Sequence, residues 1–172
     1  MNKICMYFLW SVILVSLCIY SFPGVCAEKK VWDIKKQSIE EKAPDFVLKD
    51  LNDKEVAFSA FKGKIVLLVF GTTWCPYCRI EIPYLKELYA KYPREEFEII
   101  NIDIQESKKK VSAHVNKNKL PFITLLDTDG TVARLYKVRG VPTKILVSKE
   151  GTILCEACRS VDIMLDRQLN KK

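Results

Sequence analysis

The chain has 172 residues, of which 28 are Lys or Arg and 21 are Asp or Glu, giving a formal net charge of +7. This length gives one domain enough residues for a proper hydrophobic core. The basic residues gather at 108–110 and 117–119 without interleaved aromatic side chains, which argues against nucleic acid as a partner. We interpret them as a solvated helix face, with an acidic partner or an anionic membrane surface as the alternative.

The first 27 residues are interpreted as a signal peptide. Lys3 precedes a nearly uninterrupted apolar run at 4–20, and residues 25–27 resemble a small-residue cleavage site. We expect an exported protein, periplasmic or extracytoplasmic, that is either cleaved after Ala27 or membrane-anchored through residues 4–25. Residues 28–42 are charged and should form a tether.

The chain then begins its folded part. Apolar segments at 46–48 and 56–58 flank a turn at 52–53, which predicts an N-terminal hairpin. The run at 65–70 is β-branched and leucine-rich without alternation, which is typical of a strand buried on both faces. Residues 76–92 have the apolar spacing of a long helix.

A second buried strand is predicted at 97–102, so the strand–helix–strand order implies parallel pairing through a right-handed crossover. The other predicted elements are a helix at 106–119, strands at 121–126, 144–147 and 152–154, a short helix at 131–136 and a final helix at 161–169. The one histidine, His114, falls in the basic helix, and we interpret it as a surface residue rather than a ligand or base.

Two cysteines, Cys75 and Cys78, lie where the strand at 65–70 gives way to the helix. Pro76 suits the first helical position, where its missing N–H costs no hydrogen bond. Unpaired N–H groups and the macrodipole favour negative charge there, so the Cys75 thiolate should be stabilised. We expect Cys75 to attack, and the more shielded Cys78, one turn along, to resolve the mixed disulfide.

Other interpretations of this pair are a structural disulfide or half of a zinc site. A c-type haem site is excluded, because Arg79 stands where C-x-x-C-H requires histidine. The strand before the pair and the helix after it favour redox chemistry, for which we expect no cofactor.

A second C-x-x-C pair, Cys155 and Cys158, lies between the last predicted strand and the final helix. Without the leader, these two pairs are the only cysteines, and an even number suits an oxidising compartment. If the strand continued through the pair, the two side chains would point to opposite faces, whereas a turn would let them bond. A structural disulfide, a second redox pair and a zinc site remain as alternatives.

The arrangement resembles the thioredoxin superfamily, and within it the exported TlpA/ResA-like thiol–disulfide oxidoreductases. The motifs that carry the resemblance are 43–46, 63–70, 74–78, 81–83, 140–143 and 150–151. It implies that residues 43–172 form a thioredoxin-like α/β domain. That domain would have a central mixed sheet flanked by helices, the N-terminal hairpin and a central αβ insert at about 106–122.

The resemblance also implies a substrate-binding surface. The Val141–Pro142 peptide bond would be cis, leaving the Val141 backbone free to bond an extended substrate segment. Trp74, Pro76 and Tyr77 would line the same surface, with Tyr77 exposed to a partner. The Pro-Tyr dipeptide between the cysteines is glutaredoxin-like and suggests a less reducing protein than thioredoxin.

Glu81 matches the family's acidic residue near the dithiol. There it would be partly buried and relay protons to or from Cys78, the alternative being a solvated helix carboxylate. Thioredoxins proper carry a buried aspartate on the strand before the motif, and here Val69 occupies that position. Acid–base help is therefore expected from Glu81, water or substrate.

The sequence predicts an enzyme that exchanges electrons with thiols and disulfides of exported proteins through Cys75 and Cys78. Cytochrome c maturation is one such process, and a membrane electron donor or acceptor is an expected partner. A metal-binding or scaffolding domain is the alternative. A peroxide reductase is less favoured because Leu68 replaces the proline of a peroxidatic motif, although its threonine is present as Thr72.

Overall fold

The computed structural model describes residues 41–169. The predicted leader and most of the predicted tether lie outside these residues and stay predictions. The described elements are β1 (Val47–Asp50), β2 (Glu55–Ala57), the 3-10 helix η1 (Phe58–Phe61), β3 (Ile65–Gly71), α2 (Pro76–Lys91), β4 (Phe97–Ile104), α3 (Lys108–Asn118), β5 (Ile123–Asp127), α4 (Thr131–Leu135), β6 (Thr143–Val147), β7 (Ile153–Glu156) and α5 (Val161–Leu169). None of the helices in this part of the chain is long and apolar enough to span a bilayer.

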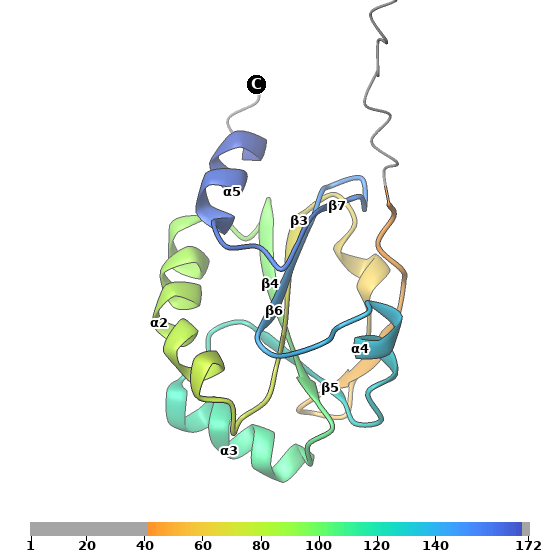
Figure 1. The fold of residues 1–172 in the computed structure, drawn as a ribbon, viewed down its shortest axis with the longest axis vertical. Coiled ribbons are helices and arrows are strands. Elements are labelled where there is room, and N and C mark those ends of the chain that lie inside the picture. Colours follow the sequence, from red (N-terminus) through yellow and green to blue (C-terminus); the bar gives the residue numbers. More distant parts are fainter. Residues whose placement is uncertain (1–40, 170–172) are drawn as a thin grey trace, which may run out of the picture. The chain divides into compact units, whose positions relative to one another are not determined.

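The strands form one mixed sheet in the order β2-β1-β5-β4-β3-β6-β7. The three central strands β5, β4 and β3 are parallel, and the outer strands pair antiparallel with their neighbours. Helices α2 and α5 cover one face of the sheet, and η1 and α4 cover the other (Figure 1). The predicted thioredoxin-like α/β fold is therefore confirmed.

The central strand β3 explains why its sequence shows no alternation. Successive side chains of a strand point to opposite faces, and here both faces are covered. Val66, Leu68 and Phe70 pack toward η1 and α4. Ile65 and Leu67 pack toward α2 and α5 in a second apolar cluster. A continuous apolar run is what such a strand requires.

The predicted insert is present as α3 and β5, between β4 and α4. Strand β5 pairs parallel to β4 and antiparallel to β1, so the insert joins the N-terminal hairpin to the central sheet. The carboxyl ends of β3 and β4 and the first turn of α2 lie at the lower end of Figure 1, beside α3. Ligand and catalytic sites of such sheets gather at this end of parallel strands.

Candidate active site

Cys75 is the N-cap residue of α2, and Pro76 opens the helix. The Cys75 Sγ accepts a hydrogen bond from the backbone N–H of Cys78 at 3.3 Å. A cysteine thus takes the place of the usual Ser, Thr, Asp or Asn, whose side-chain oxygen satisfies one free N–H of the first turn. The Cys75 sulfur therefore sits where backbone donors stabilise a thiolate, as predicted from the sequence.

The pKa values of the two thiols are shifted in opposite directions. Burial opposes ionisation of Cys75, but hydrogen bonds from the Cys78 thiol and from the backbone of Cys78 and Tyr77 lower its pKa below the ordinary thiol range. Burial and the neighbouring Cys75 raise the pKa of Cys78 to about 12. Cys75 therefore ionises more readily than Cys78, which holds its proton near neutral pH.

The two cysteines differ in exposure. Cys75 has only 3% of its surface exposed, and Cys78 is half-buried as a whole residue. The Cys78 thiol is nonetheless shielded, since burial is the largest cause of its raised pKa. The Cys75 Sγ lies 3.6 Å from the carbonyl oxygen of Val141, so the Val141–Pro142 loop lies against it. The two thiols thus differ in how readily they ionise as well as in exposure.

The predicted substrate-binding residues surround Cys75. The Val141–Pro142 bond is cis, as the resemblance implied. Trp74 and Tyr77, which flank Cys75 and Pro76 in the chain, have large, exposed side chains. A groove of about 450 Å³ next to Trp74 and Val141 is lined by backbone and side chains that include Arg134 and Arg139.

Glu81 is half-buried on α2, and its Oε1 accepts a 2.7 Å hydrogen bond from Lys144 Nζ. Lys144 belongs to β6, opposite Val69 of β3. Side chains of directly opposed residues lie on the same face of a sheet, so β6 directs this ammonium toward α2. Lys144 is a site residue that sequence reasoning missed.

A second set of polar residues lies at the carboxyl end of β4. The backbone N–H and Oγ1 of Thr73 donate to the Glu106 carboxylate, which also pairs with Lys110. Asp103 is buried beside Glu106, and burial together with that carboxylate raises the pKa of Asp103 to about 8. The sequence signal for Asp103 is an acidic residue near the end of β4, a largely apolar strand.

A hollow of about 30 Å³ lies between Asp103 and the second cysteine. Its lining includes Cys78, Glu81, Asp103, His114 and Pro142. His114 is half-buried, and burial lowers its pKa. His114 thus lies partly at the surface, and its residue also forms part of the lining of the hollow.

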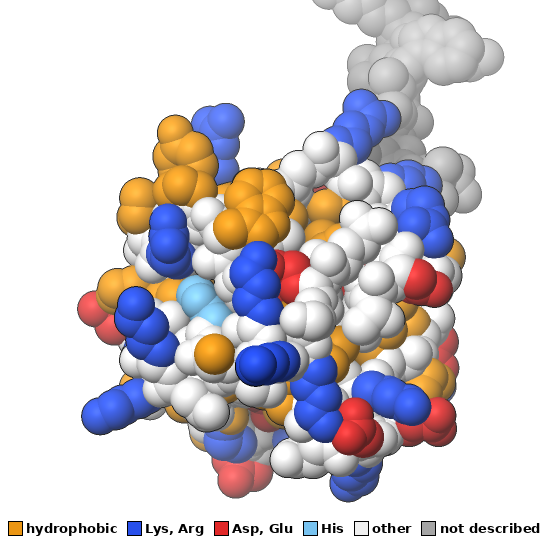
Figure 2. Space-filling view, turned by 90° about the horizontal axis from the view of Figure 1, so that it is seen from below, with side chains coloured by type: hydrophobic (Ala, Val, Ile, Leu, Met, Phe, Trp, Pro, Cys, Tyr) orange, Lys and Arg blue, Asp and Glu red, His pale blue; other side chains and the backbone are white. Residues whose placement is uncertain are grey.

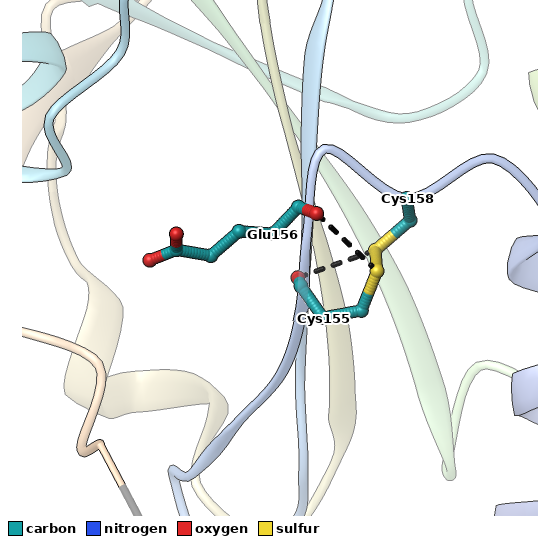
Figure 3. Close-up of a disulfide and its surroundings, with 3 residues drawn as sticks. All are labelled: Cys155, Glu156 and Cys158. Carbon is teal, nitrogen blue, oxygen red and sulfur yellow. Dashed lines mark hydrogen bonds between the residues drawn. A yellow bond between two sulfur atoms is a disulfide. The ribbon is translucent and has the colours of Figure 1, made fainter.

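Cys155 and Cys158 form a disulfide (Figure 3). Strand β7 ends at Glu156, and Ala157 adopts a positive φ of 50°, so the chain turns between the two cysteines. Cys158 is buried in the apolar cluster with residues of α5. Its backbone N–H donates to the carbonyl of Lys144, which places this disulfide beside the Glu81–Lys144 pair.

Zinc was one alternative for the cysteine pairs. Within residues 41–169, no three His, Cys, Asp or Glu side chains are grouped so that they could hold a metal ion. The described structure therefore gives no support to a zinc site that combines both C-x-x-C motifs.

The comparisons with known proteins agree with this geometry. A family model described as the AhpC/TSA family matches residues 39–155. The chain belongs to the AhpC/TSA family. A similar protein, the thiol-disulfide oxidoreductase ResA of Bacillus thuringiensis subsp. konkukian, is 38% identical over 122 residues, which cover 71% of this chain and 70% of ResA.

Solved structures similar to this AhpC/TSA-family chain carry the same activity in their names. The thioredoxin domain of a thiol-disulfide oxidoreductase from Bacteroides vulgatus has a TM-score of 0.70 at 28% identity, covering 76% of this chain and 97% of that domain. A secreted disulfide oxidoreductase of Mycobacterium tuberculosis, homologous to E. coli DsbE, has a TM-score of 0.58 at 27% identity, covering 63% and 79%. The chain is accordingly a thiol–disulfide oxidoreductase of the ResA/DsbE type.

Proposed function

We propose that this oxidoreductase exchanges electrons with exported proteins, with Cys75 as the attacking sulfur and Cys78 as the resolving one. The observation that carries the proposal is the position of Cys75 as N-cap of α2, where its Sγ accepts the backbone N–H of Cys78 at 3.3 Å. The lowered pKa of Cys75 and the raised pKa of Cys78 agree with this geometry. The Cys75 thiolate attacks one sulfur of a substrate disulfide, and the other substrate sulfur leaves as a thiolate.

The Cys78 thiol then loses its proton and attacks the Cys75 sulfur of the mixed disulfide. This forms the Cys75–Cys78 disulfide and releases the second substrate sulfur as a thiolate. Two electrons have passed to the substrate, and the reverse sequence oxidises a substrate dithiol. A membrane electron donor or acceptor would return the Cys75–Cys78 pair to the oxidation state in which the cycle began.

Two features support protein substrates in an extracytoplasmic compartment. The groove beside Trp74 and Val141 offers room for an extended chain segment. One similar protein is named as secreted, and the leader expected at residues 1–27 would export this chain. The resemblance to ResA-like proteins extends the proposal to the cysteine pairs of apocytochromes c.

The face that carries this site is rich in Lys and Arg side chains (Figure 2). Part of this charge comes from α3, whose first three residues are lysines and which contains Lys117. Such a surface attracts acidic partners through long-range electrostatics. We therefore expect the proposed substrates to carry acidic surfaces near their own reacting cysteines.

Trapping of mixed disulfides tests this function. C78S, incubated with a disulfide-bonded substrate such as insulin or an oxidised C-x-x-C-H peptide, should accumulate a mixed disulfide through Cys75. C75S should accumulate none and should lose turnover, while a C155S/C158S variant serves as the matched control for removal of a cysteine pair. Full turnover by C75S would contradict the assignment.

A further inference from the structure

Three buried oxygen atoms around the hollow have no hydrogen-bond partner among residues 41–169. They are Thr72 Oγ1, Glu81 Oε2 and Asp103 Oδ1. All three residues line the hollow together with Cys78. Buried polar atoms almost always have a partner, and a hollow of this size has room for ordered water, which needs about 10–15 Å³. Glu81, Asp103 and Cys78 therefore line one hollow that can hold a water molecule.

The two carboxyl groups differ in their surroundings. Glu81 has the Lys144 ammonium at 2.7 Å, and such a partner stabilises the charged carboxylate. Asp103 is only 4% exposed and has the Glu106 carboxylate as its neighbour. Burial and this like charge raise the pKa of Asp103 to about 8. At neutral pH, Asp103 is thus a neutral acid.

We propose that Asp103 supplies the proton that Cys78 takes up when the Cys75–Cys78 disulfide is opened. A substrate thiolate attacks Cys75, the bond between Cys75 and Cys78 breaks, and the Cys78 sulfur leaves with the electron pair. Asp103 gives its proton through water in the hollow to that sulfur and becomes a carboxylate. In the reverse direction, the Asp103 carboxylate accepts the proton from Cys78.

This transfer is favourable because Cys78 binds a proton more strongly than Asp103 does. The pKa of Cys78 is raised to about 12 and that of Asp103 to about 8. A thiolate with so high a pKa is a poor leaving group unless it is protonated as it leaves. The carboxylic acid of Asp103 on β4 therefore supplies the proton that the Cys78 sulfur needs in order to leave when the disulfide opens.

Other titratable and charged groups face this hollow and Asp103. Glu106, just before α3, and Lys110, in α3, act on Asp103, while His114 of α3 and Glu81 of α2 line the hollow. Arg79 acts on His114, and Lys144 of β6 pairs with Glu81. Of these, Glu81 is the rival proton donor, since its residue also lines the hollow. The test must therefore separate Asp103 from Glu81.

The experiment measures the rate at which the full chain in its disulfide form is reduced by dithiothreitol, from pH 6 to pH 10. Rates are divided by the concentration of dithiothreitol thiolate. In the wild-type chain, this corrected rate should fall as pH rises through about 8, where Asp103 loses its proton. D103N should lack this inflection and react at least tenfold more slowly at pH 7, since general acid catalysis contributes roughly 10²–10⁴-fold.

E98Q provides the matched control, because Glu98 is another buried carboxyl on the same strand. It should keep the wild-type profile. An inflection that survives in D103N and disappears in E81Q would overturn the proposal and assign the proton to Glu81. If D103N folds poorly, infrared spectroscopy of the wild-type chain still decides, because a neutral carboxyl band must be lost as the pH rises through about 8.

This inference rests on the proposed role of Cys78 as the resolving thiol. The two can fail separately. D103N should still form the mixed disulfide through Cys75, whereas failure of the proposed function would appear as an absence of trapping in C78S, whatever residue occupies position 103.

Discussion

Lys144 Nζ lies 2.7 Å from Glu81 Oε1 and joins the edge of β6 to the first turns of α2. The side chain of Lys144 is 10% exposed and that of Glu81 is 27% exposed. Removal of one partner of a buried pair leaves the other charge without compensation, whereas removal of both is often nearly neutral. The pair therefore joins the helix that begins with the two cysteines to the sheet, and loss of one partner should destabilise the fold.

We expect K144M to lower the free energy of unfolding by about 1–3 kcal/mol, because the half-buried carboxyl group of Glu81 loses its hydrogen-bond partner. The E81Q/K144M double variant should be more stable than the sum of the two single effects predicts. Urea denaturation of the wild-type chain and the three variants measures this coupling. Strict additivity would show that the contact contributes nothing.

The second prediction concerns which thiol reacts with a small alkylating reagent. The lowered pKa of Cys75 favours its alkylation at pH 7, while the pKa of Cys78, about 12, keeps that thiol protonated. Exposure favours the opposite order, since Cys75 is 3% exposed and Cys78 is half-buried. We expect ionisation to prevail, because the thiolate is the reacting species.

Iodoacetamide labelling of the reduced chain, followed by mass spectrometry of the peptides, measures the two rates. In denaturant, both residues should react at similar rates, which serves as the control. Faster labelling of Cys78 in the folded chain would mean that accessibility decides and that the order of attack must be reconsidered.

The third prediction concerns the Cys155–Cys158 disulfide, which closes a sequence separation of only three residues. A loop this short restricts the unfolded chain little, so C155A/C158A should cost roughly 2 kcal/mol of stability. If the disulfide is structural, the redox potential of Cys75/Cys78 and the turnover with insulin should stay unchanged. Altered turnover with an unchanged potential would instead favour the second redox pair, which the sequence left open.

Much of the fold was predictable because it rests on local patterns. The apolar run of β3, the helical spacing of α2 and the turn chemistry of the hairpin each depend on residues close together in the chain. The positions of Cys75 and Val141 followed from motifs of the same kind. These patterns also placed the cysteine pair at the start of α2.

The environment of Cys78 was not predictable in this way. Lys144, Asp103 and His114 come from β6, β4 and α3 and meet only after the sheet is assembled. A lysine inside a strand looks like a surface residue until its neighbours are known. The burial of Cys75 was likewise not predictable, because it depends on the Val141 loop, which lies far away in the chain.

The last prediction concerns the pH dependence of stability that Asp103 creates. Its pKa is raised from 3.8 to about 8 in the folded chain, because burial and Glu106 disfavour the carboxylate. Between these values, the folded state binds more protons than the unfolded state, so this carboxyl's contribution to the free energy of unfolding falls as pH rises. The contribution is fully present below pH 3.8 and is lost by the time the pH passes 8.

D103N removes this titration, so its stability relative to the wild-type chain should increase between pH 5 and pH 9. The increase should exceed about 1 kcal/mol, the equivalent of one pKa unit. Urea denaturation at several pH values measures the difference, with E98Q as the control that should follow the wild-type curve. Parallel curves for D103N and the wild-type chain would show that Asp103 ionises normally in the folded state. It could then not hold a proton for Cys78 at neutral pH.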